Sequence, residues 1–372
     1  MDIDISLGLQ SNKESNDFLR CLWANIRKEF GKIAWNLLPL KVENKIFVGY
    51  CDIGLDKALE VTLKAKIKGC LSSIIFSIPD EMSNKEQIES RLKGCITKTR
   101  HGLGQYKIWG LSCSLNKFAN FGKIEGVSFS ILGNKLSIKV KAYDEIDAQT
   151  MIMSLIKTIC AYMSLDVMEY ICVGTSADNS DTDACVEECQ QHYKSIRLSD
   201  EIIQYIDTFI ANPFLYENNL SVLDKSVCLY AQGLRYSEMI FQHLNSFENY
   251  GELAVLYFMS ALEVITLNDI KPETCTECGQ QRYSIARRVV DFVYDVTKSE
   301  TMKKKMKDYY AYRSKFVHTG EMLSSSNYVG TSIPLLSIRE KDGIIMQLPF
   351  CIDELKDIVK KCIMSRFRNG VS

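Results

Sequence analysis

A short segment around residue 313 combines two side chains that could act together on a phosphodiester. Arg313 and His318 are separated by Ser314, Lys315, Phe316 and Val317. A guanidinium can bind phosphate oxygens in a bidentate manner and stabilise charge in a transition state. An imidazole can transfer protons near neutral pH. Together, the two groups could promote attack of an RNA 2′-hydroxyl on its own phosphate without a metal ion.

The residues around this pair predict the end of a helix. Residues 301–317 have helical character, and Gly320 suits the left-handed position that follows a helix C-terminus. His318 would lie in the last turn, where the helix dipole favours a protonated imidazole. Side chains five residues apart on a helix are about 140° apart. A long arginine and a histidine at a helix end could still converge on one shared cleft. Because this spacing also occurs by chance in many helices, the alternative interpretation is a histidine that caps carbonyl groups and an arginine in a surface ion pair.

Glu263 is the one charged residue in the apolar stretch 255–265. A buried carboxylate needs a partner, because its desolvation is costly. We hypothesise that Glu263 pairs with Arg313 or Arg287 and orients it. The alternative is a glutamate at an exposed or partly exposed position.

A basic segment surrounds the pair in a chain that is otherwise neutral. Residues 282–318 carry ten lysines and arginines against four acidic residues, whereas the whole chain has 45 basic and 46 acidic side chains. This excess predicts a groove that follows RNA phosphates. The expected RNA-binding residues are Arg282, Arg287, Arg288 and Lys315. The lysine run 303–305 is equally compatible with a solvated helix face.

Two groups of cysteines have spacings that suit a metal. Cys275 and Cys278 form a CxxC pair, which is half of a tetrahedral zinc site. The second half would come from Cys185 and Cys189, with His192 as an alternative ligand. Four protein ligands leave no open position, so a zinc ion here would be structural. Free thiols or a redox pair are the alternatives.

The patterning changes along the chain and predicts an α+β protein. Residues 59–67, 127–131 and 136–140 alternate between apolar and polar, and the last two runs flank Gly133-Asn134, which predicts a β-hairpin. Shorter strands are expected at 45–50, 72–78 and 106–113, with a helix near 17–29. We therefore expect a mostly antiparallel β domain, with a β-sandwich as one arrangement.

From residue 145 onwards, apolar residues recur at helical spacing. Helices are expected at 199–211, 220–244, 250–267, 283–296 and 301–317, and from 353 onwards, with a small hairpin at 331–346. The predicted organisation is a β-rich regulatory domain with a closing helix (1–174), a linker with candidate metal ligands (175–194) and an all-α helical domain (195–372).

The C-terminal part resembles a HEPN domain, and specifically the ApeA-like HEPN group. Three blocks resemble that group in order: Phe258–Glu263, then Cys275–Gly279 with Ile285–Val289, and finally Tyr312–His318, which is similar to its Arg-Ser-x-x-x-His block. The resemblance covers residues 253–367 at most. It implies a helical bundle with metal-independent endoribonuclease activity, in which Arg313 and His318 are catalytic and Tyr312, Ser314 and Glu263 are supporting residues.

The resemblance also implies a homodimer, in which the Arg and His of two protomers face one cleft. Many family members are toxins or abortive-infection effectors against phage, so a phage-derived or cellular trigger is expected as a partner. No cofactor is expected for catalysis. Two alternatives remain open: a non-catalytic HEPN-like dimerisation or binding module, and a zinc-stapled adaptor.

The composition is that of a globular protein, with 46% hydrophobic and 24% charged residues. The balanced charge excludes a global positive field that would attract nucleic acid or an anionic membrane. The longest apolar stretch, 253–267, is shorter than a membrane span and contains Glu263. We therefore expect a cytoplasmic protein without a membrane partner.

Overall fold

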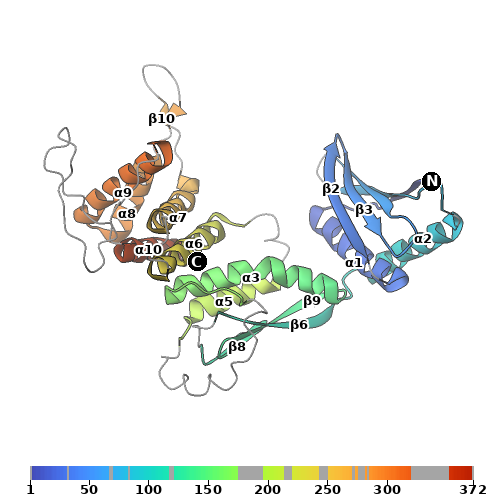
Figure 1. Cartoon of the computed structure of the whole chain (residues 1–372), viewed down its shortest axis with the longest axis horizontal. Coiled ribbons are helices and arrows are strands. Elements are labelled where there is room, and N and C mark those ends of the chain that lie inside the picture. The colour runs from blue at the N-terminus through green and yellow to red at the C-terminus, as the bar shows by residue number, and fades with distance from the viewer. Residues whose placement is uncertain are drawn as a thin grey trace. The chain divides into compact units, whose positions relative to one another are not determined.

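Figure 1 shows a computed structural model of the chain, an α+β fold with an antiparallel sheet region followed by a mostly helical part, as the sequence predicted. Two compact units are formed, by Met1–Leu111 with Lys139–Ile152, and by Ser112–Ile138 with Met153–Ser372. The predicted linker and the predicted hairpin 331–346 lie outside the described residues. The structure describes residues 2–31, 33–66, 70–82, 84–116, 121–174, 196–212, 220–242, 250–269, 273–274, 281–282, 285–319 and 352–370.

The first unit contains a five-stranded antiparallel sheet with the strand order β1-β5-β4-β3-β2. Alternate residues of the inner strands are buried, for example Leu59, Val61 and Leu63 of β4. This alternation is the pattern from which the strand was predicted. The strands are β1 (Asp2–Ser6), β2 (Ala34–Val42), β3 (Lys45–Asp52), β4 (Leu59–Ala65) and β5 (Leu71–Ser77).

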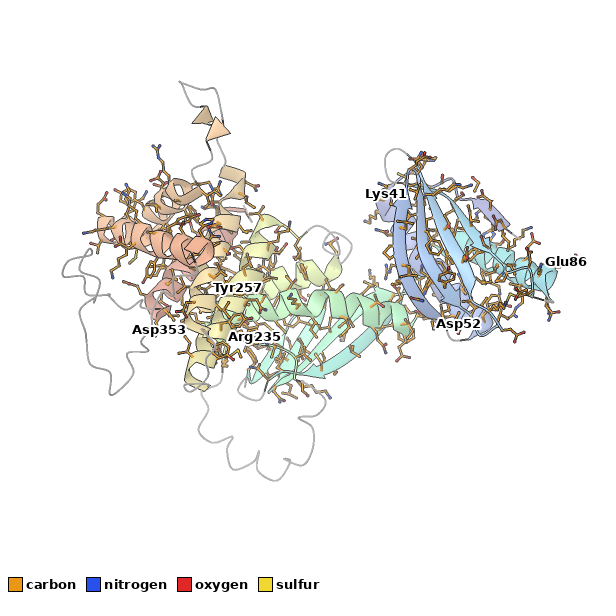
Figure 2. The ribbon with its side chains drawn as sticks, turned by 45° about the horizontal axis from the view of Figure 1, so that its top comes forward. Lys41, Asp52, Glu86, Arg235, Tyr257 and Asp353 are labelled. Carbon is orange, nitrogen blue, oxygen red and sulfur yellow. The ribbon has the colours of Figure 1, made fainter. Side chains whose placement is uncertain are left out.

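Two helices share one core with this sheet, α1 (Asn12–Phe30) and α2 (Lys85–Gly102). The suggestion of a β-sandwich is therefore wrong, because helices and not a second sheet bury the apolar face. Helix α1 was predicted, although it begins earlier, where the Ser11 hydroxyl accepts the Glu14 N–H at 3.1 Å. Helix α2 was not predicted, because its buried residues are spaced among many charged residues. Glu86, in the first turn of α2, is labelled in Figure 2.

Two ion pairs hold α1 against the start of α3 (Glu145–Val167) within the first unit. Arg20 binds Asp147 through two hydrogen bonds of 2.6 and 2.8 Å, and Arg27 binds Asp144 in the same manner at 2.6 and 2.9 Å. Asp144 also accepts the N–H of Asp147, so it caps the helix. Both carboxylates lie at a helix N-terminus, where negative charge is favourable.

A second antiparallel sheet has the strand order β6-β9-β8-β7. Its central hairpin joins β8 and β9 through Gly133-Asn134, where Gly133 has a φ of 62°. This hairpin confirms the prediction from the Gly-Asn pair, since glycine adopts positive φ at no steric cost. The strands are β6 (Lys107–Ser114), β7 (Lys123–Glu125), β8 (Phe129–Leu132) and β9 (Lys135–Ala142).

The remaining helices confirm the predicted helical series. They are α5 (Asp200–Ala211), α6 (Val222–Gln242), α7 (Tyr250–Ile265), α8 (Ile285–Thr297), α9 (Glu300–Thr319) and α10 (Ile352–Gly370). A 3₁₀ turn η3 (Leu267–Asp269) and short strands β10 (Glu273–Thr274) and β11 (Gln281–Arg282) lie between α7 and α8.

Among the described helices, α3 alone is long and apolar enough to cross a membrane. Its most apolar 18-residue window is 61% buried inside the protein, which is typical of a core helix. Helix α3, rather than the stretch 253–267 that was expected from the sequence, is therefore the described segment most similar to a membrane-spanning helix in length and apolarity.

Helices α6, α7 and α10 form the centre of the second unit. Gly233 of α6 has no side chain, and a Cβ there would lie 2.5 Å from the Phe258 ring of α7. The two helices can therefore approach closely at this point. Tyr257 of α7, labelled in Figure 2, stacks on Tyr236 of α6 with 5.4 Å between ring centroids. This packing fixes the position of α7.

Asp224 joins three helices of the second unit through a saturated buried carboxylate. Its Oδ1 accepts the hydroxyls of Tyr162 in α3 and Tyr205 in α5 at 2.8 and 2.9 Å. Its Oδ2 accepts both the N–H and the hydroxyl of Ser221, and the Ser221 hydroxyl in turn accepts the Asp224 N–H. The side chain is fully buried, so each of these hydrogen bonds forms without competition from water.

Replacement of Asp224 by alanine should destabilise the helical unit by about 3 kcal/mol, because several buried donors then lose their acceptor. Tyr205→Phe removes only one donor and should cost about 1 kcal/mol. Urea unfolding followed by far-UV circular dichroism measures both changes. Equal costs for the two variants would show that the carboxylate does not organise this junction.

Candidate active site

Helix α7 places Glu263 near the end of an apolar helix. The neighbouring residues Leu262 and Ile265 are buried, whereas the Glu263 side chain is 17% exposed. The helix is fixed by its packing on α6, so the carboxylate has little freedom to move into water. It must find its hydrogen-bond donors on the adjoining helices.

Helix α9 presents these donors to α7. Met306, Tyr310 and Arg313 follow one another at spacings of four and three residues, so they share one face of the helix. Met306 is fully buried, and Tyr310 and Arg313 are partly buried. The apolar end of this face packs in the core, and its polar end lies against Glu263.

Each oxygen of the Glu263 carboxylate accepts one hydrogen bond from α9. The Tyr310 hydroxyl donates to Oε1 at 2.7 Å, and Arg313 Nη2 donates to Oε2 at 3.2 Å. The pairing of Glu263 with Arg313 is one of the two that were predicted from the sequence. Tyr310 was not predicted, although its position three residues before Arg313 places it on the same helix face.

The arrangement holds the Arg313 guanidinium without using all of its donors. Its Nε is buried and has no hydrogen-bond acceptor among the described residues. The guanidinium carbon lies 5.8 Å from the centre of the Tyr310 ring, which adds a cation–π contact. Burial, and next the hydrogen bond to Glu263, raise the pKa of the Tyr310 phenol, so that it stays protonated and donates.

Arg288 of α8 contributes to the site by donating hydrogen bonds to groups at the C-terminal end of α7. Its Nε donates to the Thr266 hydroxyl at 2.9 Å, and its Nη2 lies 3.4 Å from the Glu263 carbonyl. A cation at a helix C-terminus satisfies free carbonyls and interacts favourably with the dipole. Arg288 was predicted to bind RNA, whereas the structure gives it these protein partners.

His318 lies in the last turn of α9 and is exposed. The described part of α9 ends one residue later, at Thr319, and Gly320, which was predicted to follow the helix end, lies outside the described residues. Among the described residues, His318 has no hydrogen bond with Arg313. Because α9 turns Arg313 towards α7, the two side chains are not brought together within one chain.

The other predicted RNA-binding and supporting residues differ in how far the structure describes them. Arg287 is exposed and pairs with Asp291 one turn later on α8, at 3.6 Å. Ser314 is partly buried. The side chains of Tyr312, Arg282 and Lys315 lie outside the described part. In the lysine run, Lys305 pairs with Glu354 of α10, which favours a structural role for that residue.

The predicted metal ligands lie outside the described residues. This holds for Cys185, Cys189, His192, Cys275 and Cys278. Where the chain is described, no three His, Cys, Asp or Glu side chains are grouped in a way that could hold a metal ion. The zinc site therefore stays a prediction.

Comparisons with known proteins identify no relative. No family model, no curated protein and no solved structure matches this chain. The arginine that Glu263 holds keeps a donor free, so this side chain is suited to binding an anionic group.

A double-mutant cycle with Glu263→Gln and Arg313→Gln should give a coupling free energy of about 1–2 kcal/mol, because both side chains are largely buried. Urea unfolding of the wild type, the two single variants and the double variant provides the four free energies.

The exposed pair Arg287 and Asp291 is the matched control, and its coupling should stay below about 0.5 kcal/mol. A Glu263–Arg313 coupling as small as that of the control would contradict a fixed ion pair.

Proposed function

We propose that this protein is a metal-independent endoribonuclease of the HEPN type, with Arg313 and His318 as its catalytic residues. The observation that carries the proposal is the Glu263 carboxylate, which fixes Arg313 next to the helix end that exposes His318. The resemblance of residues 253–367 to the ApeA-like group supports the same assignment. The basic side chains along α8 and α9 would attract the RNA.

In the proposed reaction, the 2′-hydroxyl of a ribose attacks the adjacent phosphorus. The bond from phosphorus to the 5′-oxygen breaks, and the products carry a 2′,3′-cyclic phosphate and a free 5′-hydroxyl. Arg313 stabilises the charge on the phosphoryl oxygens. His318 transfers a proton, either from the 2′-hydroxyl or to the leaving oxygen. The proposed reaction is an intramolecular transesterification, so it requires neither a water molecule nor a metal ion at the phosphorus.

We propose further that two copies of the chain form one cleft. Positions 313 and 318 are about 140° apart on α9, and Arg313 is engaged on α7. A second chain could supply the histidine that a single chain does not bring to its own arginine. Two imidazoles per cleft would also allow one to act as the base and the other as the acid.

The proposed setting follows from the family resemblance. The protein would be a cytoplasmic anti-phage effector, and the N-terminal sheet region would recognise a phage-derived or cellular trigger. A structural zinc ion would involve the cysteines at 185, 189, 275 and 278. The second candidate function is a non-catalytic binding module, which is favoured by the engagement of Arg313 in an ion pair that also stabilises the bundle.

Purified protein should cleave RNA in the presence of EDTA and leave 2′,3′-cyclic phosphate ends. Arg313→Ala and His318→Ala should each reduce the rate at least about 100-fold, because they remove charge stabilisation and proton transfer. Thr301→Ala, an exposed change on the same helix, should retain the wild-type rate. Gel analysis of end-labelled RNA with circular dichroism of each variant measures these effects.

A 2′-deoxy substitution at the cleaved nucleotide should abolish cleavage, since it removes the attacking hydroxyl. Cleavage that persists in the folded Arg313 and His318 variants would exclude these residues as catalytic. Total inactivity of the wild-type protein towards RNA would favour the binding module.

Mixing the inactive Arg313→Ala and His318→Ala proteins should restore part of the activity, because a mixed dimer can place one intact arginine opposite one intact histidine. Rates are measured after the two proteins are unfolded and refolded together. If the co-refolded mixture is as inactive as each variant alone, each cleft is built from a single chain.

A further inference from the structure

A pocket lined by three cysteines lies in the second unit, between α3, α6 and the segment 170–173 that follows α3. The cysteines are Cys160 of α3, Cys172 of the segment and Cys228 of α6. The volume of the pocket is about 190 Å³, and the pocket is partly open to solvent. A cavity of about 150 Å³ in another protein is large enough to bind benzene. This pocket therefore has room for one aromatic ring with a small substituent.

The segment 170–173 forms a fixed wall of the pocket. The N–H of Tyr170 donates to the Glu238 carboxylate of α6 at 2.6 Å, and the N–H of Ile171 donates to the Ser164 hydroxyl of α3 at 2.8 Å. The Asn116 side-chain amide donates to the Tyr170 carbonyl at 2.9 Å. These hydrogen bonds tie the segment to both helices, so the pocket is already formed without a ligand, as is usual for small-molecule sites.

Small side chains on the two helices leave the volume unfilled. Ala161 of α3 and Ala231 of α6 line the pocket and are buried. Protein interiors are closely packed, and voids larger than a water molecule are rare in them. The atoms around such a void lack dispersion contacts on one side. A ligand of matching size would provide these contacts.

The chemical state of the cysteines favours an apolar ligand. Burial raises the pKa of the Cys160 and Cys228 thiols, so both stay protonated near neutral pH. Protonated thiols are poor nucleophiles and poor metal ligands. Their sulfur atoms are polarizable and make favourable contacts with the edges of aromatic rings. The lining is thus better suited to an aromatic ring than to a metal ion or a redox reaction.

Polar side chains lie at the solvent side of the same pocket. Lys157 of α3 is exposed, and its positive charge is close enough to Cys228 to act on the pKa of that thiol. The Gln232 amide and the Tyr170 phenol line the pocket and are partly buried. An ammonium group binds a carboxylate, and the amide and the phenol can donate further hydrogen bonds to it.

We propose that this pocket binds a small molecule with one aromatic ring and a carboxylate. The ring lies among Cys160, Cys172 and Cys228, and the carboxylate points towards Lys157. The site uses none of the residues of the proposed cleavage reaction. It is therefore a second site of the helical unit, with its own ligand.

Isothermal titration of the full chain with benzoate, cyclohexanecarboxylate and acetate tests this assignment. Benzoate should bind with a dissociation constant below about 1 mM. Cyclohexanecarboxylate has a similar size but no aromatic ring, so it should bind at least about threefold more weakly. Acetate lacks the ring and should not bind in this range. Lys157→Gln should weaken benzoate binding about threefold, because the lysine is exposed.

Two substitutions that fill the pocket locate the ligand. Ala231→Leu should weaken benzoate binding at least about tenfold, because the added side chain occupies the space of the ring. Cys228→Leu, at a partly exposed position, should have the same effect and decides the outcome if thermal unfolding shows that Ala231→Leu is not folded. The matched control is Cys113→Leu, the same change at a partly buried cysteine of β6 that does not line the pocket, and it should retain the wild-type affinity.

Absence of benzoate binding at about 5 mM would overturn the proposal. Benzoate affinity that is unchanged in the folded pocket-filling variants would place the ligand elsewhere. Equal affinities for benzoate and cyclohexanecarboxylate would show that the pocket does not recognise an aromatic ring, and an unchanged affinity in Lys157→Gln would show that it does not recognise the carboxylate. All titrations are made without RNA, so the result does not depend on whether the protein cleaves RNA.

Discussion

A carboxylate near the end of an apolar helix needs hydrogen-bond donors, and Glu263 of α7 finds them where α9 packs against it. Both oxygens are used by side chains from one face of α9, Tyr310 and Arg313. Arg288 from α8 secures the carbonyl end of the same helix. Three helices thus meet at one ion pair, and the position of the guanidinium follows from the packing of the bundle.

Two carboxylates of the second unit differ in burial and in the number of hydrogen bonds that they accept. Asp224 is fully buried and accepts four hydrogen bonds, so it has no remaining capacity for another group. Glu263 accepts one side-chain hydrogen bond per oxygen and remains partly exposed. Its partner Arg313 keeps a donor without an acceptor among the described residues. Only the second arrangement leaves hydrogen-bonding capacity for another group.

The helical unit carries polar groups at both ends of α8. At the first end, Arg288 and the Glu263 pair form the candidate active site, and at the other end α10 turns a polar face towards an open hollow. Helix α10 can do this because its apolar residues are confined to the opposite face, where they pack on α6 and α7. Helix α8 contacts both α9 and α10.

Local patterns in the chain were sufficient to predict most elements. The alternation in β4, the Gly-Asn turn between β8 and β9 and the apolar periodicity of α7 each depend on neighbours in sequence, and each was confirmed. Helix α2 was missed because its few apolar positions are spread among charged residues. The apolar surroundings of Glu263 indicated that it needs a partner, and local sequence could name only two arginines. The choice of Arg313, the contribution of Tyr310 and the role of Arg288 at the end of α7 required the folded chain, because these contacts join residues 22 to 50 positions apart. The pocket between α3 and α6 likewise brings together segments that are distant in the sequence, which only tertiary packing places side by side.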